Sequence, residues 1–209
     1  MQPPQGIMTF QLPAGGGPLT GRDLERACLA GGPDNMPWPT DLRHNDHHLS
    51  LQNLANESGG FLVVPWEIAG AGRLMGTSAT LMSRAAPYGL VLELARGKVN
   101  QLRNQAADWQ AAGLKAPDDL TEQVRQASLL FGHALTAGDP AEADRRAGEA
   151  LVVAYTAAER LVLAYCQQVL QARHERQARF DTALSCRVGP TVPPARPHNS
   201  FEALSSNGL

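Results

Sequence analysis

The sequence lacks the long hydrophobic segments of a membrane protein or an exported protein. No stretch approaches the ~18 uninterrupted apolar residues that a membrane span requires. Residues 1–17 have neither the basic segment nor the apolar run of a signal peptide. We therefore expect a protein of the cytoplasm without a membrane partner, with export by another route left open.

Charge of one sign is not in excess, and cysteine is scarce. Eighteen Lys and Arg residues against twenty Asp and Glu residues leave a formal net charge of −2. Proteins that bind nucleic acid need a basic surface, so we expect no nucleic-acid partner. The cysteines Cys28, Cys166 and Cys186 lack metal-ligand spacing and are odd in number, which favours reduced thiols over a disulfide framework.

Motifs of the common catalytic sites are missing as well. The chain has no nucleophile elbow, phosphate-binding glycine loop, dinucleotide fingerprint or CxxC pair. Retaining glycoside hydrolases need two carboxylates about 5–5.5 Å apart, and the pair Asp118 and Asp119 is better explained as a helix cap. We expect this chain not to be catalytic by itself and to hold no cofactor.

His44, His47 and His48 form the densest group of possible metal ligands. Zinc would require imidazoles that converge with a further His, Cys or carboxylate. Adjacent residues of one strand point to opposite faces, so His47 and His48 would diverge. The pattern favours a polar turn, and we expect no metal site.

The first 85 residues carry the patterning of a β layer. Residues 7–12 and 60–68 are typical of strands, and residues 45–46 suit the tight turn of a hairpin. Residues 20–32, "TGRDLERACLAGG", predict one short helix that is capped by Thr20 or Asp23 and ends at the paired glycines. We expect about five strands in all, arranged as an antiparallel sandwich-like layer.

From Pro87 onward the apolar residues recur with a helical period of 3.6 instead of two. Three helices are predicted: from Pro87 to Gly113, from Pro117 to Gly138, and from Pro140 to about Gln177. Gly97 costs ~1 kcal/mol relative to alanine inside a helix, so we expect another backbone to pack closely against it.

These patterns predict an α+β fold in three parts. Residues 1–85 form the β-rich subdomain, residues 86–180 form a three-helix antiparallel bundle, and residues 181–209 form a Pro- and Ser-rich linker or disordered tail.

Two groups of polar residues are candidates for a binding surface. The loop residues Asp34, Asn35 and Trp38 could bind sugar hydroxyls and stack against a ring, although a packed loop with Trp38 in the core is the simpler interpretation. Glu93, Arg96, Asn100 and Arg103 follow one side of the first long helix. They could bind a glycan, and the simpler interpretation is a solvated face or a salt-bridge network with the β layer.

Three stretches carry a resemblance to a known family: residues 19–40, residues 57–82, and above all residues 87–110, "PYGLVLELARGKVNQLRNQAADWQ". The chain resembles the N-terminal region of planctomycete-type family 10 glycoside hydrolases, which are endo-1,4-β-xylanase-like proteins. The likeness extends over most of residues 7–188 as a block pattern rather than a catalytic signature.

That resemblance implies an accessory role. The family's catalytic unit is a (β/α)8 barrel with two catalytic glutamates, and neither glutamate motif is present here. Such a barrel needs about 250 residues and cannot fit after Cys186. The resemblance therefore implies a non-catalytic module that binds a polysaccharide or oligosaccharide, or that supports a C-terminal catalytic barrel of the parent protein.

A protein-interaction or scaffold module is the alternative. Residues 118–135 and 139–162 have the spacing of a tetratricopeptide-like helical hairpin. One such pair is fewer than the number of repeats that stacks stably alone.

Overall fold

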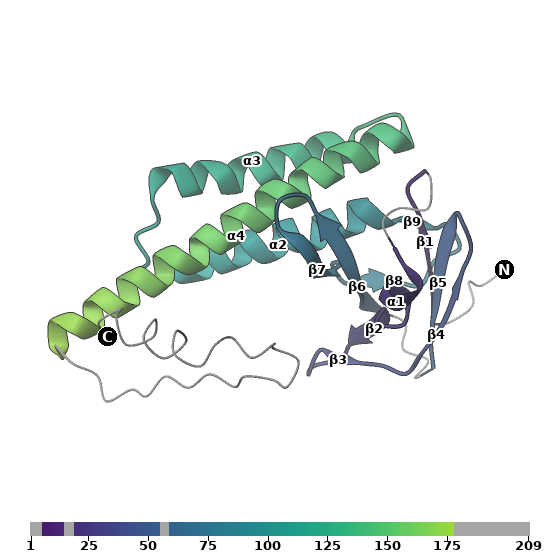
Figure 1. Ribbon diagram of the computed structural model, residues 1–209, viewed down its shortest axis with the longest axis horizontal. Helices are drawn as coiled ribbons and strands as arrows, with labels where there is room; N and C mark the ends of the chain where they lie inside the picture. The colour runs from purple at the N-terminus through teal and green to yellow at the C-terminus, as the bar shows by residue number, and fades with distance from the viewer. Residues whose placement is uncertain (1–5, 15–18, 55–58, 178–209) are drawn as a thin grey trace, which may run out of the picture. The chain divides into compact units, whose positions relative to one another are not determined.

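The computed structural model describes residues 6–14, 19–54 and 59–177. Strands fill the first half of the chain and long helices the second, which confirms the predicted α+β class (Figure 1). Among these residues, those through Gln171 form one compact unit, and residues 172–177 belong to a second unit. The predicted tail, residues 181–209, lies outside the described residues.

The strands form two sheets. The first sheet has the order β4 (Thr40–His44), β5 (His48–Asn53), β1 (Ile7–Gln11), β9 (Tyr88–Gly89), and only the β1–β9 pair is parallel. The second has the order β3 (Met36–Pro37), β2 (Cys28–Gly31), β6 (Gly59–Ile68), β7 (Gly72–Thr77), with β8 (Leu81–Met82) also paired to β6. The described residues thus contain nine strands rather than about five, because several pairings are only two residues long.

The predicted hairpin turn is confirmed. β4 and β5 pair antiparallel from Thr40↔Asn53 to His44↔Leu49. At the turn, the side-chain oxygen of Asn45 accepts hydrogen bonds from the backbone N–H groups of His47 and His48, at 2.9 and 2.8 Å. An Asn side chain that mimics a backbone acceptor is what stabilises such a turn.

The expectation of one helix up to the paired glycines was wrong. Helix α1 covers only Gly21–Leu24, where the Thr20 hydroxyl and the Asp23 carboxylate form a capping box. The following residues form β2, which pairs with β6 from Cys28↔Val63 to Ala30↔Phe61. Pairing with a distant strand satisfies these backbone groups and overrides the weak local helix signal.

The three predicted long helices are present: α2 (Leu90–Ala111), α3 (Asp118–Leu135) and α4 (Pro140–Arg176). α2 begins three residues after Pro87 because Tyr88 and Gly89 pair with β1. Gly113, at φ 102°, follows its end. The Asp139 carboxylate accepts the backbone N–H of Glu142 at 2.9 Å and so caps the first turn of α4.

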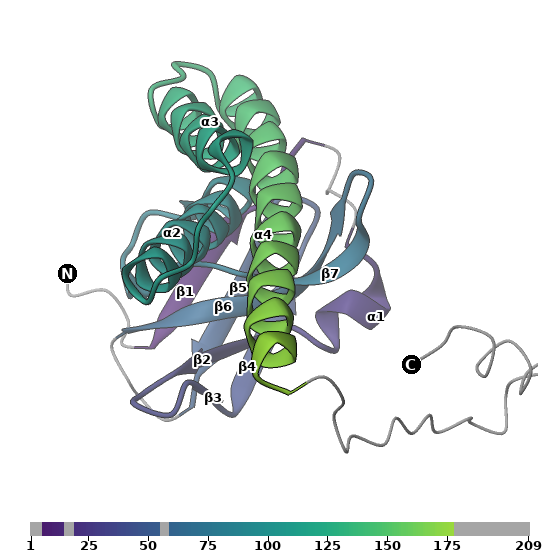
Figure 2. The same cartoon turned by 90° about the vertical axis from the view of Figure 1, so that its left-hand side faces the viewer.

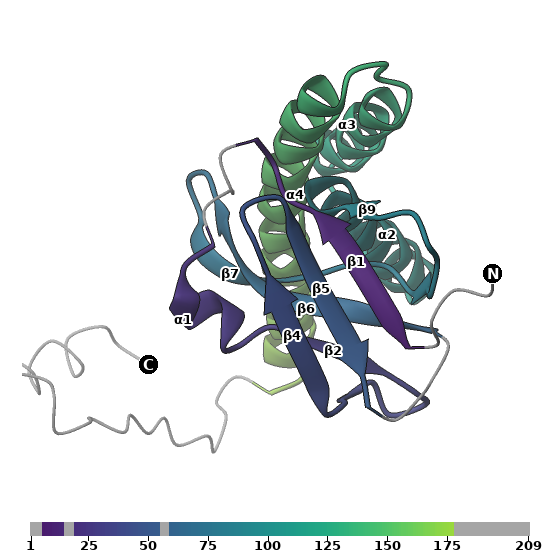
Figure 3. The ribbon, with the colours of Figure 1, turned by 90° about the vertical axis from the view of Figure 1, so that its right-hand side faces the viewer.

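One hydrophobic cluster joins the strands to the helices. It contains Phe10 and Leu51 of the first sheet, Leu62 of the second sheet, Leu94 of α2 and Leu151 of α4. α4 passes in front of β6 and β7 in Figure 2, whereas β1, β5 and β4 are in front in Figure 3. A second cluster of small and aliphatic side chains joins the three helices to one another.

Another backbone segment packs closely against Gly97, as the sequence predicts. A β-carbon on Gly97 would lie 2.0 Å from the Thr77 carbonyl oxygen and 2.6 Å from the Ser78 carbonyl carbon. Real β-carbons do not approach backbone atoms this closely, so glycine is required at this position. The segment after β7 therefore rests directly on the backbone of α2.

Replacing Gly97 by alanine is expected to lower the free energy of unfolding by about 2 kcal/mol or more, because backbone atoms must move to admit the methyl group. Gly132→Ala is the matched control. It lies in α3 with no atom within 4 Å of its added β-carbon, so it should raise stability by up to ~1 kcal/mol. Urea unfolding measures both values, and equal effects would contradict the close contact.

Candidate functional site

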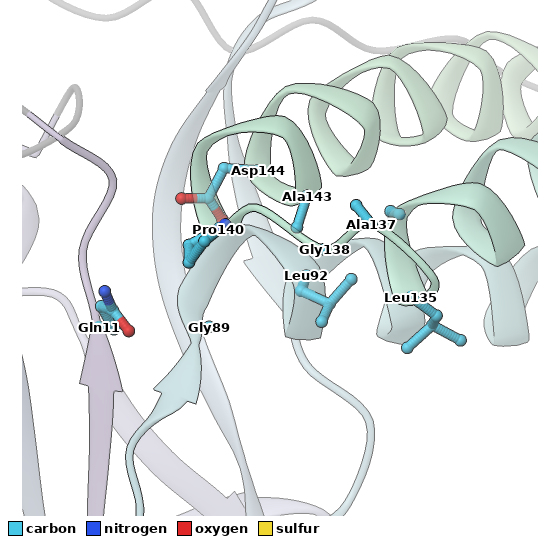
Figure 4. A pocket seen from close by; sticks show the side chains of 10 residues that line it. Gln11, Gly89, Leu92, Leu135, Ala137, Gly138, Pro140, Ala143 and Asp144 are labelled. Carbon is cyan, nitrogen blue, oxygen red and sulfur yellow. The ribbon is translucent and has the colours of Figure 1, made fainter.

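A small pocket lies where two parallel strands end and two helices meet. Gln11 and Gly89 are paired last residues of β1 and β9, and α2 begins directly after Gly89. The end of α3 and the start of α4 close the other side (Figure 4). The pocket has a volume of about 250 Å³ and is lined by Gln11, Gly89, Leu92, Ala134, Leu135, Ala137, Gly138, Pro140, Ala143 and Asp144. We call it the Asp144 pocket.

Asp144 and Gln11 supply the polar side chains of this pocket. Asp144 is half-buried in the first turns of α4, and burial raises the pKa of its carboxyl group. It has no hydrogen-bond or ion-pair partner among residues 6–14, 19–54 and 59–177. Gln11 is exposed and projects from β1 (Figure 4). A carboxylate and a carboxamide beside apolar walls can bind a small ligand with hydroxyl groups.

Glu93 lies at the joint between α2 and the strands. It is only 3% exposed, and its Oε2 atom lies 3.3 Å from Arg96 Nη1 without forming a hydrogen bond. Burial raises the pKa of Glu93, while the positive charges of Arg96 and Arg84 act in the opposite direction. Glu93 and Arg96 are therefore brought together, as an ion pair between a buried carboxylate and a half-buried guanidinium.

Arg84 reinforces this joint. Its guanidinium lies 3.5 Å from the centre of the Tyr88 ring and donates hydrogen bonds to the carbonyl oxygens of Ala86 and Pro87. These contacts fix the chain directly before α2. Arg84 thus holds local structure directly before α2, and the ion pair of Glu93 with Arg96 lies within α2 itself.

Asn100 and Arg103 are not part of the Glu93 joint. Both are exposed on α2, one and two turns after Arg96. The predicted polar set therefore separates into the Glu93–Arg96 ion pair and two solvated side chains. Helical spacing places all four residues on one side, but the strands cover only the first part of that side.

The loop candidates lie at the β2–β3 hairpin. Asp34 and Asn35 are exposed, and Asn35 has a left-handed backbone with φ 51°. Trp38 packs its six-membered ring against backbone, because β-carbons added to Gly31 and Gly60 would lie 2.3 and 2.6 Å from ring atoms. This tryptophan packs against the core, as the packed-loop interpretation expects. None of the three residues lines the Asp144 pocket.

Sequence reasoning missed an ion-pair network between α1 and the β6–β7 hairpin. Arg73 contacts the Asp23 carboxylate and also lies 3.4 Å from Glu67. The hydrogen bond from Arg73, followed by that from the Thr20 hydroxyl, lowers the pKa of Asp23 from 3.8 to about 2. Fifty positions separate Asp23 from Arg73, so the local sequence showed only the helix cap.

Two further features of the described residues bear on function. No group of three or more His, Cys, Asp or Glu side chains in this part of the chain could hold a metal ion. No helix here is long and apolar enough to cross a membrane.

Comparison with known proteins gives no relative: no family model matches the chain, and no curated protein or solved structure is significantly similar to it. Function therefore has to be inferred from the residues and their geometry.

Asp23→Asn is expected to lower the free energy of unfolding at pH 7 by about 2 kcal/mol, because the amide keeps an acceptor oxygen but loses the charged hydrogen bond with Arg73. The pKa of Asp23 is lower in the folded state, so its contribution is complete above about pH 4. The difference between wild type and variant should disappear as the pH falls toward 2.

The control for this prediction is Asp41→Asn, which removes an exposed ion pair with Arg43. Its effect should stay within ~0.5 kcal/mol. Denaturant titrations between pH 2 and pH 7 measure the free energy of unfolding of both variants. The same pH dependence in Asp23→Asn and Asp41→Asn would contradict the prediction.

Proposed function

We propose that this chain is a non-catalytic, carbohydrate-binding accessory module of a glycoside hydrolase-type protein, with the Asp144 pocket as its sugar site. The resemblance of residues 87–110 to family 10 proteins suggests the class of parent protein. The observation that carries the proposal is that Asp144 is the single carboxylate among the residues that line the pocket.

A single carboxylate supports binding better than hydrolysis. Both mechanisms of glycoside cleavage need a second acidic group across the scissile bond. The buried carboxylates Asp23 and Glu93 are engaged by arginines elsewhere in the fold. Asp144 with Gln11 can instead accept and donate hydrogen bonds to adjacent hydroxyl groups, while Leu92 and Pro140 contact the apolar face of a ring.

The pocket volume limits the size of the ligand. Its volume of about 250 Å³ is below the ~300–1,000 Å³ of pockets for drug-sized molecules. We therefore expect recognition of one sugar unit, such as the end of a xylo-oligosaccharide, rather than an extended chain. The rest of the glycan would remain in solvent or contact a following catalytic barrel.

Calorimetric titration of the full chain with xylose, xylobiose and xylotriose tests this function. Saturable binding is expected, and Asp144→Ala should weaken it about tenfold or more, because a charged hydrogen-bond acceptor contributes ~1.5–3 kcal/mol. Asp108→Ala, an exposed carboxylate on α2 outside the pocket, is the matched control and should leave binding unchanged.

Three results would contradict the proposal. Absence of saturable binding removes the carbohydrate function, and unchanged binding in Asp144→Ala removes the site. Release of reducing sugar that is lost in Asp144→Asn would show catalysis. Trp38→Ala should reduce thermal stability and leave binding at the pocket intact, because its indole packs against Gly31 and Gly60.

A protein-interaction module is the second candidate, and exposed apolar side chains favour it. Leu129 and Leu135 of α3 and Leu163 of α4 are 46%, 48% and 54% exposed. α4 has 37 residues against 18 in α3, so the pair is more unequal than the helices of a regular repeat. The exposed leucines of both helices are the binding surface expected of this candidate.

A further inference from the structure

A groove lies between the end of β6 and the first half of α4, which crosses that strand in Figure 2. Its volume is about 320 Å³, so it is larger than the Asp144 pocket and lies within the ~300–1,000 Å³ of small-molecule sites. The two cavities share no lining residue. We call this cavity the Trp66 groove.

The walls of the Trp66 groove are apolar side chains of the core. Trp66 and Ile68 of β6 line it and are only 6% and 3% exposed. Val152 of α4 lines it from the other side and packs against the same hydrophobic cluster. Core packing holds these side chains in place, so a ligand does not have to order the walls when it binds.

Gly148 keeps the α4 side of the groove open. It lines the groove, and a β-carbon added to it would have no atom within 4 Å. Glycine destabilises the interior of a helix relative to alanine. At Gly97 a close backbone contact requires glycine, whereas no such contact exists at Gly148 in the described part of the chain. A side chain at this position would fill space that is open to a ligand.

The charged side chains of the groove offer acceptors rather than donors. Glu67, Arg145 and Glu149 line it. Each nitrogen of Arg145 already donates to a carboxylate, since Nε and Nη2 bond to Glu142 at 2.7 Å and Nη1 bonds to Glu149. One oxygen of Glu67 accepts from Arg73 at 3.4 Å. The second oxygen of Glu67 and of Glu149 accepts no hydrogen bond from the residues that the structure describes.

We propose that the Trp66 groove binds a small organic amine, with the apolar body of the amine between the core side chains and its ammonium group beside the carboxylates that line the groove. An ammonium group has three donors and no acceptor, which complements two open carboxylate oxygens. The lining residues carry two negative charges and one positive charge, so an anionic ligand would be repelled. This site is independent of the proposed sugar site.

Binding should be weak and sensitive to salt. A dissociation constant on the order of 0.1–1 mM is expected for a ligand as small as phenethylamine, because few atoms make contacts. The side chains of Glu67 and Glu149 are 49% and 48% exposed. Added salt therefore screens their attraction for the ammonium group and should raise the dissociation constant.

NMR titration of the full chain with phenethylamine tests the site. The indole N–H signal of Trp66 should shift in a saturable manner, and that of Trp109, which stacks on Tyr165 between α2 and α4, should not. Phenethyl alcohol has the same ring and chain without the charge and should bind at least about fivefold more weakly. The anion 3-phenylpropionate should give no saturable shift.

Filling the groove tests the position of the ligand. Gly148→Leu should raise the dissociation constant of phenethylamine at least about tenfold, because the leucine side chain occupies the groove. Gly132→Leu is the matched control and should leave binding unchanged. Its added β-carbon also has no atom within 4 Å, and it lies on α3 outside the groove. Circular dichroism checks that both variants are folded.

Removing one charge tests the recognition of the ammonium group. Glu149→Gln keeps the shape of the groove and should weaken phenethylamine about threefold or more, while phenethyl alcohol binds as before. Glu122→Gln is the control, because Glu122 is an exposed glutamate that pairs with Arg125 on α3. This comparison does not depend on the folding of Gly148→Leu.

Four results would overturn the proposal. The first is a wild type whose Trp66 signal shows no saturable shift at millimolar phenethylamine. The second is equal affinity for phenethylamine and 3-phenylpropionate. The third is unchanged binding in folded Gly148→Leu or in Glu149→Gln. The fourth is loss of phenethylamine binding in Asp144→Ala, which would place the amine in the other cavity.

Discussion

The direct contact between the backbone of α2 at Gly97 and the segment after β7 is the constraint on which the structure depends. No side chain fits between them, since a β-carbon would lie 2.0 Å from the Thr77 carbonyl oxygen. This contact fixes the depth of α2, so that Leu94 packs on Gly76 of β7. It also lets β9, directly before α2, pair with β1. Strands and helices consequently share one core.

Three of the buried or half-buried carboxylates occupy different environments. Asp23 accepts hydrogen bonds from Arg73 and Thr20, and its pKa falls to about 2. Glu93 has an arginine nearby but an oxygen without a hydrogen bond, and burial raises its pKa. Asp144 lines a pocket, and burial raises its pKa as well. The first two are engaged within the fold, and the third is the carboxylate of the proposed sugar site.

α4 contributes both to the proposed sugar site and to the core. Its start forms one wall of the Asp144 pocket, and its middle packs Ala150 and Leu151 into the core. Its second half is held by the stacking of Tyr165 on Trp109 and by the hydrogen bond from Gln168 to Gly113.

The sequence by itself determined the α+β class, the three helices, the Asn45 turn, and the need for close packing at Gly97, because periodicity, capping and glycine preferences act over a few residues. Only the tertiary structure decided that Cys28–Gly31 pairs with β6 as a strand and that Arg73 forms an ion pair with Asp23. It also decided that Gln11 and Asp144 line the same pocket. Those contacts join residues far apart in the chain, and no local pattern encodes which distant partner completes a hydrogen bond or walls a cavity.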